Sequence, residues 1–105
     1  MPKQKNPIQS GLQAQVRYTS EGRGGTVHYV SSEASFDMWY EFAGGNALAI
    51  IDIPPPEYWT ARTQLPLSQR EEILIFIGNQ VVKDHAPGGS FTLSRNTLTI
   101  YSGRK

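Results

Sequence analysis

Apolar and polar residues alternate along most of the first half of the chain. Over 35–42 every second residue is apolar or aromatic, and the residues between them are polar or charged apart from Trp39. A period of two residues is typical of a β-strand with one buried face. The same kind of pattern predicts strands over 13–19, 26–31 and 46–53, and consecutive prolines end the last of them.

In the second half of the chain the spacing changes to that of a helix. Apolar residues recur at intervals of three and four, which predicts an amphipathic helix over 69–84. Ser68 and Glu71 fit a capping box at its start, and Pro87-Gly88-Gly89 ends it. Alternation returns over 90–101, which predicts a C-terminal strand or hairpin.

Together these elements predict an α+β fold. The first strands follow one another without long crossovers, so we expect an antiparallel β-meander with one main helix packed on one face of the sheet. The segment 57–62 is predicted to form a short helical turn. Residues 1–12 are predicted to be a flexible tail and 13–105 a single α+β domain. The predicted core consists of Val27, Tyr29, Phe36, Met38, Tyr40, Ala49, Ile51, Ile53, Ile73, Phe76, Ile77 and Val81.

The turn between 35–42 and 46–53 sets the expected register of these two strands. Gly44-Gly45 suits a two-residue hairpin, since a type I′ turn needs positive φ at both central positions. A slip of one residue would exchange the two faces of the strands. The face expected to contact the helix is entirely apolar or aromatic, with the pairs Phe42–Ala47, Tyr40–Ala49, Met38–Ile51 and Phe36–Ile53.

The opposite face of the same strands is mixed in character. Like charges directly opposite each other repel, and an uncovered patch of Trp, Leu and Ile is typical of a binding surface. The register pairs Glu41 with Leu48, Trp39 with Ile50 and Asp37 with Asp52, while His28 and Val30 join from the preceding strand. The candidate binding residues are therefore His28, Asp37, Trp39, Glu41, Leu48, Ile50 and Asp52.

Three interpretations of this mixed face stay open. In the first, the N-terminal segment or the C-terminal hairpin covers it, and the aspartates are solvated. In the second, it binds a protein partner or a second copy of the chain, with Trp39 as an energetic anchor. In the third, Asp37, Asp52, Glu41 and His28 form a ligand or catalytic site, because close carboxylates serve acid/base chemistry or hold a hard cation.

Composition narrows the partner classes. The formal net charge is +1 and the ten Lys and Arg are scattered, so a nucleic-acid partner is not expected. The chain has no cysteine, which excludes disulfides, thiolate metal sites and cysteine nucleophiles. The N-terminus has no apolar signal-peptide region, and no apolar run reaches the length of a membrane span. We therefore expect a cytoplasmic protein with no membrane partner.

The common catalytic and metal-binding patterns are missing from the sequence. His28 and His85 lack the spacing of zinc ligands, and no Gly-x-Ser-x-Gly elbow occurs, so no cofactor or metal is expected. Pro55-Pro56-Glu57-Tyr58 matches the Pro-Pro-x-Tyr ligand pattern of WW domains, but the same residues fit a strand end followed by a helix start. We expect a non-enzymatic binding or protein-interaction module. The alternative is a small enzyme or small-molecule-binding protein with a carboxylate–histidine site on the same face.

Overall fold

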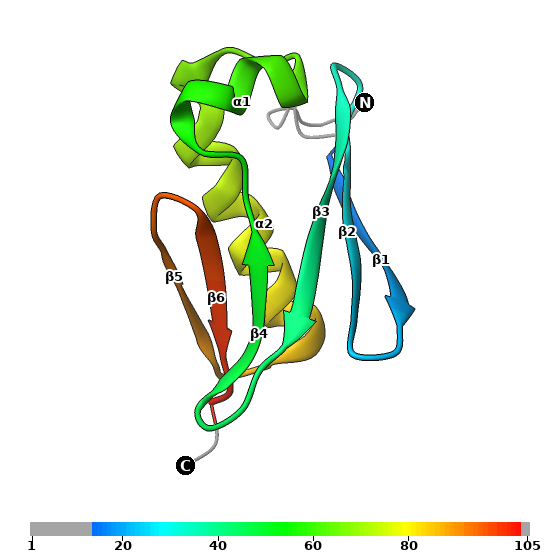
Figure 1. Cartoon of the computed structure of the whole chain (residues 1–105), viewed down its shortest axis with the longest axis vertical. Coiled ribbons are helices and arrows are strands. Elements are labelled where there is room, and N and C mark those ends of the chain that lie inside the picture. Colours follow the sequence, from blue (N-terminus) through cyan, green and yellow to red (C-terminus); the bar gives the residue numbers. More distant parts are fainter. Residues whose placement is uncertain (1–13, 104–105) are drawn as a thin grey trace, which may run out of the picture.

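A computed structural model gives the fold of residues 14–103 (Figure 1). The elements are β1 (Gln15–Glu21), β2 (Gly24–Val30), β3 (Ser35–Phe42), β4 (Ala47–Asp52), α1 (Pro56–Thr63), the 3-10 turn η2 (Leu67–Gln69), α2 (Arg70–His85), β5 (Ser90–Leu93) and β6 (Thr97–Tyr101). The strands form one antiparallel sheet in the order β1-β2-β3-β4-β6-β5. α2 packs against one face of it, so the predicted α+β fold is confirmed.

Most predicted elements lie within two residues of their observed positions. The strand predicted over 35–42 is β3, the short turn over 57–62 lies inside α1, and 90–101 forms the β5–β6 hairpin. The tail predicted over 1–12 lies outside the described residues, as does residue 13 at the start of the first predicted strand.

The start of α2 differs from the prediction. The expected capping box is wrong, because Ser68 lies in η2 and the N-cap residue Gln69 makes no side-chain capping hydrogen bond. Glu71 and Glu72 still occupy the first turn of α2, where carboxylates interact favourably with the helix dipole. The preceding 3-10 turn leads the chain into α2 without a side-chain cap.

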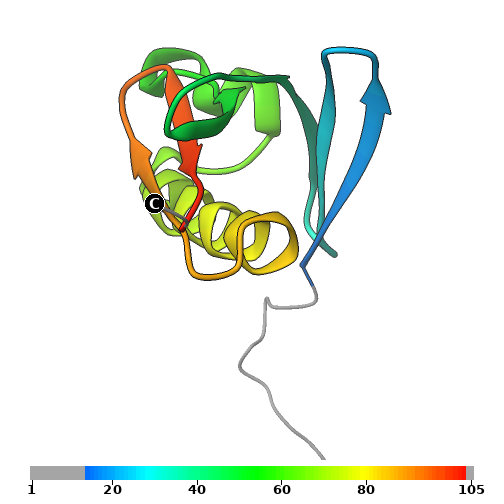
Figure 2. The ribbon, with the colours of Figure 1, turned by 90° about the horizontal axis from the view of Figure 1, so that it is seen from below.

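The sheet is strongly curved and wraps around α2. Seen from below, the strands form an arc, with the β5–β6 hairpin and the β1–β2 hairpin at its two ends and α2 inside it (Figure 2). α2 contacts β1 at one end of the sheet and β5 and β6 at the other. The curvature gives the sheet a concave inner face, which covers the core, and a convex outer face.

The centre of the sheet contains a very short ladder. β3 and β4 pair only through Tyr40–Ile51, Glu41–Ile50 and Phe42–Ala49, and above these pairs the two strands diverge (Figure 1). The predicted register is therefore wrong by two residues. The turn has Gly45 and Asn46 at its centre, with the Ala47 amide donating to the Gly44 carbonyl, and only Gly45 adopts positive φ. A shift of two residues leaves each side chain on its predicted face.

Leu48 is an exception to this rule. The pairing of β4 with β6 shifts between Ala47 and Ala49, as a β-bulge does. Leu48 therefore turns to the inner face and packs against the core, not on the mixed outer face where the sequence pattern placed it. The bulge also adds to the local bend of β4.

The core fills the space between the inner face, α2 and α1. All the predicted core residues are buried except Phe76, which is partly buried at its edge. The sequence pattern missed Trp59 of α1, which is 0% exposed. Its ring lies edge-on to Phe36 at 5.4 Å, and its Nε1 donates to the Pro66 carbonyl at 3.0 Å. The core also contains residues outside the predicted set, namely Leu65, Leu74, Ala86, Leu98 and Ile100.

Candidate functional site

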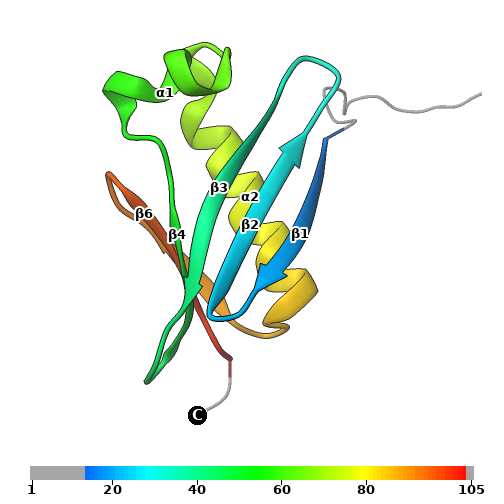
Figure 3. The same cartoon turned by 45° about the vertical axis from the view of Figure 1, so that its right-hand side comes forward.

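The outer face carries six of the seven candidate binding residues. Figure 3 shows this face on β1, β2 and β3, with α2 behind the strands. Trp39 and Ile50 are 40% and 38% exposed there, and no helix or strand within residues 14–103 covers them. The β5–β6 hairpin extends the sheet beside β4, so it does not form the cover that one interpretation required. The six residues are His28, Asp37, Trp39, Glu41, Ile50 and Asp52.

The two aspartates are not a pair. Asp37 on β3 lies opposite His28 on β2, whereas Asp52 on β4 lies opposite Thr97 on β6. The β3–β4 ladder stops at Tyr40 and Ile51, before it reaches either aspartate. The predicted Asp37–Asp52 pair is therefore wrong, because the hairpin turn lies one residue later in the chain than Gly44-Gly45 suggested.

Asp37 instead belongs to a chain of hydrogen bonds across three strands. The Asp37 Oδ1 and His28 Nδ1 atoms lie 2.7 Å apart, and the His28 Nε2 and Thr19 Oγ1 atoms lie 3.0 Å apart. The side chains of His28 and Asp37 are 29% and 66% exposed. Thr19 was missed by the sequence analysis. A two-residue turn at Gly22-Arg23 pairs Thr19 with Thr26 and makes it a diagonal neighbour of His28 on the same face.

A hydroxyl, an imidazole and a carboxylate in this order are also the parts of a hydrolase triad. Such a triad needs hydrogen-bond donors aimed at the developing oxyanion and a concave site for the substrate. The Thr19–His28–Asp37 chain lies open on a convex face, and neither of the two cavities described below is lined by its residues. The geometry therefore fits a cross-strand link better than a reaction centre.

The Trp39 ring lies next to Gly24, on the same outer face as this chain of hydrogen bonds. A Cβ atom on Gly24 would lie 3.0 Å from the Trp39 ring, so the indole covers the bare backbone of that glycine. The indole Nε1 donates to Glu41 Oε2 at 3.2 Å. These two contacts hold the ring on one side, and the side chain remains 40% exposed.

Within residues 14–103 no group of three or more histidine, aspartate or glutamate side chains comes together in a way that could hold an ion. Asp37 and Asp52 were the carboxylates expected to cooperate, and they belong to different ladders.

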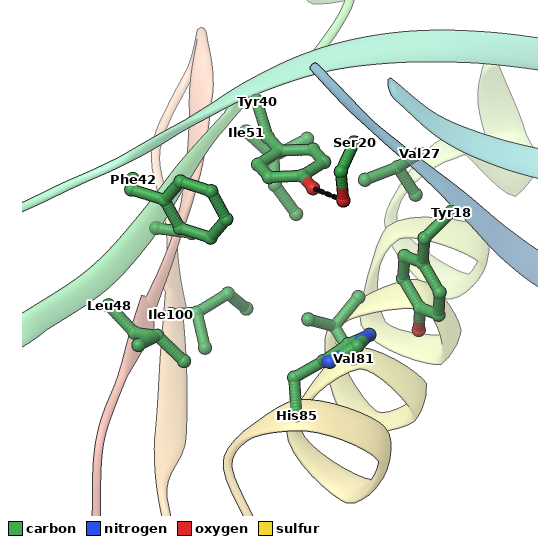
Figure 4. Close-up of a pocket in the computed structure, with 11 residues that line it drawn as sticks. Tyr18, Ser20, Val27, Tyr40, Phe42, Leu48, Ile51, Val81, His85 and Ile100 are labelled. Atoms are coloured by element: carbon green, nitrogen blue, oxygen red, sulfur yellow. Dashed lines mark hydrogen bonds between the residues drawn. The ribbon is translucent and has the colours of Figure 1, made fainter. Parts of the chain in front are cut away.

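A cavity of about 350 Å³ lies on the inner face, between the sheet and the last turns of α2 (Figure 4). Its floor is apolar and buried, and includes Val27, Ile51, Val81 and Ile100. Its rim carries larger and more exposed groups, among them Tyr18, Phe42, Leu48 and His85. No sequence pattern indicated this cavity, because its walls come from β1, β2, β3, β4, β6 and α2.

Tyr18 forms one wall of the cavity and ties β1 to α2. Its hydroxyl donates to Asp84 Oδ2 at 2.7 Å, and its ring meets the His85 ring edge-on at 4.4 Å. Burial raises the pKa of the Tyr18 phenol above its ordinary value, and the hydrogen bond to the Asp84 carboxylate raises it further. The phenol therefore stays neutral and donating throughout the physiological range.

A second cavity of about 330 Å³ lies at the other end of α2, near the start of β1. Its lining includes Ala14, Tyr29, Ile73 and Phe76, together with the carboxylates of Glu33 and Glu72. Burial raises the pKa of Tyr29, and the nearby Glu33 and Glu72 raise it as well, while a hydrogen bond involving Ser31 acts in the opposite direction. Ala14, the first residue that the structure describes, lines this cavity.

Comparisons of the chain with protein-family models, with curated proteins and with solved structures found no match. No helix within residues 14–103 is long and apolar enough to cross a membrane.

The Pro-Pro-x-Tyr segment begins α1, so Pro56, Glu57 and Tyr58 are helical and do not form the extended polyproline ligand that WW domains bind.

Proposed function

We propose that this protein is a small non-enzymatic interaction module that binds a basic partner protein through the outer face of its sheet. The observation that carries this proposal is the exposure of Trp39 and Ile50 on a face that no described element covers. Tryptophan is among the side chains that most often anchor protein interfaces, and its ring is already oriented by Gly24 and Glu41. Little conformational entropy would therefore be lost from this side chain on binding.

The charges around Trp39 indicate the chemistry of the partner. Asp37, Glu41 and Asp52 are exposed on the outer face of β3 and β4. The cation Arg17 lies on β1, opposite His28 and two strands from Asp37, and its guanidinium donates hydrogen bonds to Gln15. Lysine or arginine side chains on a partner would complement these carboxylates and speed the encounter. A second copy of the chain would present the same carboxylates across a two-fold axis, so self-association is disfavoured.

The shape of the surface also favours a protein over a small molecule. Small ligands bind in concave sites that bury most of their surface, and the outer face is convex. A protein partner can cover such a face with a flat or extended surface of its own. A cysteine-free chain fits a reducing compartment, and we propose the cytoplasm as the place of the interaction.

Site-specific photo-crosslinking tests the proposal. A benzophenone amino acid would replace Trp39 in one variant and Tyr58, an exposed aromatic residue on α1, in the matched control. In cells of the natural host we expect a defined adduct from position 39 and none from position 58. The double charge reversal Asp37→Lys with Glu41→Lys should abolish the adduct, while Glu71→Lys on the exposed face of α2 should leave it intact.

The identity of the adduct decides between the partner classes. A partner rich in lysine or arginine at the crosslinked segment supports the proposal. An adduct between two copies of this chain, or adducts of equal yield from positions 39 and 58, would contradict it. Size-exclusion chromatography of wild type and Trp39→Asp gives an independent check, because the proposal expects both to be monomers.

A second candidate function is supported by the Thr19–His28–Asp37 chain of hydrogen bonds, which has the order of groups used in ester hydrolysis. A nitrophenyl acetate assay compares wild type with Thr19→Val and His28→Gln. The interaction proposal expects the same slow hydrolysis from all three proteins. Loss of a measurable turnover in both variants would favour the catalytic alternative instead.

A further inference from the structure

The inner cavity has the size and construction of a small-molecule site. Its volume of about 350 Å³ lies at the lower end of the range of about 300–1,000 Å³ over which small-molecule sites fall. An apolar cavity of about 150 Å³ is already enough for benzene. The open rim gives access from solvent, since Phe42 is 54% exposed there.

The walls of the cavity would contact a ligand on several sides. Phe42 and Leu48 lie on one side and Tyr18 and His85 on the other, and all four side chains point toward the space between them (Figure 4). The Phe42 ring is held edge-on to Tyr40 at 5.5 Å, and the His85 ring edge-on to Tyr18 at 4.4 Å. Aromatic and aliphatic side chains arranged in this way favour a flat apolar body.

One polar group on the cavity wall makes only a long hydrogen bond. The Tyr40 hydroxyl lies 3.5 Å from the Ser20 hydroxyl, longer than the usual O–H···O distance of about 2.7–2.8 Å. Tyr40 is buried, and no shorter hydrogen bond to its hydroxyl occurs within residues 14–103. A Cβ atom at position 25 would lie 2.9 Å from that hydroxyl, so Gly25 leaves room for it. A ligand atom could therefore complete the hydrogen bonding of Tyr40.

The electrostatics at the mouth disfavour an anion. The Asp84 carboxylate lies beside Tyr18, and α2 ends at His85, so the negative end of the helix dipole points to this side of the molecule. Lys83 lies in the same turn but is not part of the cavity lining. The His85 ring nitrogens can bond an uncharged polar group.

We propose that the inner cavity binds a small uncharged molecule with an apolar, aromatic or short acyl body and one hydrogen-bonding group that reaches Tyr40. This site is separate from the outer face, because adjacent residues of β3 point to opposite sides of the sheet. Tyr40 and Phe42 line the cavity, whereas Trp39 and Glu41 belong to the partner surface.

Two dyes with the same apolar body test the ligand class. N-Phenylnaphthylamine is uncharged and becomes fluorescent in apolar surroundings, and anilinonaphthalene sulfonate adds one negative charge to the same rings. With the full chain at neutral pH we expect saturable, one-to-one binding of the uncharged dye. The sulfonate should bind at least about tenfold more weakly, because its charge meets Asp84 and the helix C-terminus. Equal or tighter binding of the sulfonate would overturn the inference about charge.

Two pairs of variants locate the bound dye. Val81→Phe should fill the cavity and abolish binding, whereas Ile73→Phe places the same ring at a buried position of α2 beside the second cavity and should leave binding unchanged. Phe42→Ala removes a half-exposed wall that the core does not need, and should weaken binding several-fold. Tyr58→Ala on α1 is its control.

The outcomes separate this inference from the proposed function. Absence of saturable binding, or binding unaffected by both Val81→Phe and Phe42→Ala, overturns the cavity site. If Val81→Phe fails to fold, as shown by its thermal melt, Phe42→Ala and its control decide alone. Trp39→Asp should bind the dye like wild type, so failure of the partner surface and failure of the cavity site are distinguishable.

Discussion

The outer and inner faces of β3 and β4 differ in every property that matters for binding, although they share the same backbone. Outside, Trp39 and Ile50 lie among carboxylates on a convex surface. Inside, Tyr40 and Phe42 face an apolar hollow beside α2. Because one curved sheet wraps around one helix, the outer side chains spread apart, whereas the inner ones surround the cavity beside α2. The same curvature therefore favours a macromolecular partner on one side and a small ligand on the other.

The largest expected difference between the faces concerns isoleucine truncation. Ile77 of α2 is fully buried against the inner face, so Ile77→Ala should lower the free energy of unfolding by about 2–5 kcal/mol. Ile50→Ala, on the exposed outer face, should change it by less than about 0.5 kcal/mol. Urea unfolding followed by circular dichroism measures both. Similar losses from the two variants would mean that something outside residues 14–103 buries the outer face.

The next largest effect is expected at Gly25, where the backbones of β1 and β2 pack closely against each other. A Cβ atom on Gly25 would overlap the Thr19 carbonyl oxygen, so Gly25→Ala must push β1 away from β2. We expect a loss of about 1–3 kcal/mol and weaker dye binding. Gly44→Ala is the control, since a Cβ atom there meets no other group within 4 Å. Equal thermal midpoints for the two variants would show that β1 is free to move at this point.

Tyr18 gives a smaller and pH-dependent effect. Tyr18→Phe removes the hydrogen bond to Asp84 and should cost about 1 kcal/mol at neutral pH. Since the folded protein raises the pKa of this phenol, the contribution is complete below the ordinary tyrosine value of about 10 and is lost as the pH rises through the higher folded value. Wild type should therefore lose stability above about pH 10 more steeply than Tyr18→Phe. Thermal melts from about pH 8 to 11 check this, with Tyr58→Phe as control.

The smallest effect concerns Asp37. Had it faced Asp52, removing its charge would have relieved repulsion and stabilised the fold. Because it faces His28, Asp37→Asn should instead be neutral or destabilising by less than about 1 kcal/mol, and salt should reduce the difference. Melting curves at low and high salt measure the effect. A clear gain in stability for Asp37→Asn would restore the aspartate pair as the better interpretation.

The sequence could predict which face of a strand each side chain occupies, but not every residue that it pairs with on the next strand. Alternation at Phe36, Met38 and Tyr40 determines which side chains point inward, and the structure confirms it. Alternation is unchanged by a two-residue slip, so it could not distinguish a turn centred on Gly44-Gly45 from one centred on Gly45-Asn46. The Asp37–Asp52 pair depended on that choice and was lost with it.

Other features of the structure leave no pattern in the sequence around them. The bulge that turns Leu48 inward depends on how Ala47 and Ala49 of β4 meet Tyr101 and Ile100 of β6, which lie far away in the sequence. The cavity depends on the curvature of the whole sheet. Trp59 is buried because its ring packs against Phe36 and its indole nitrogen donates to the Pro66 carbonyl. Nothing in its own helix separates it from the exposed Tyr58 beside it.

The pairing of β4 with β6 also has a consequence for the order in which the chain assembles. Every other ladder among the described strands joins neighbours in sequence, whereas β4 and β6 are separated by α1, η2, α2 and β5. Closing that long loop carries the largest entropic cost of any ladder and should limit the folding rate. The cavity takes walls from both sides of this ladder, with Tyr40 on one side and Ile100 on the other. A ligand that recognises the cavity would thus bind only chains in which this slow, long-range step is complete.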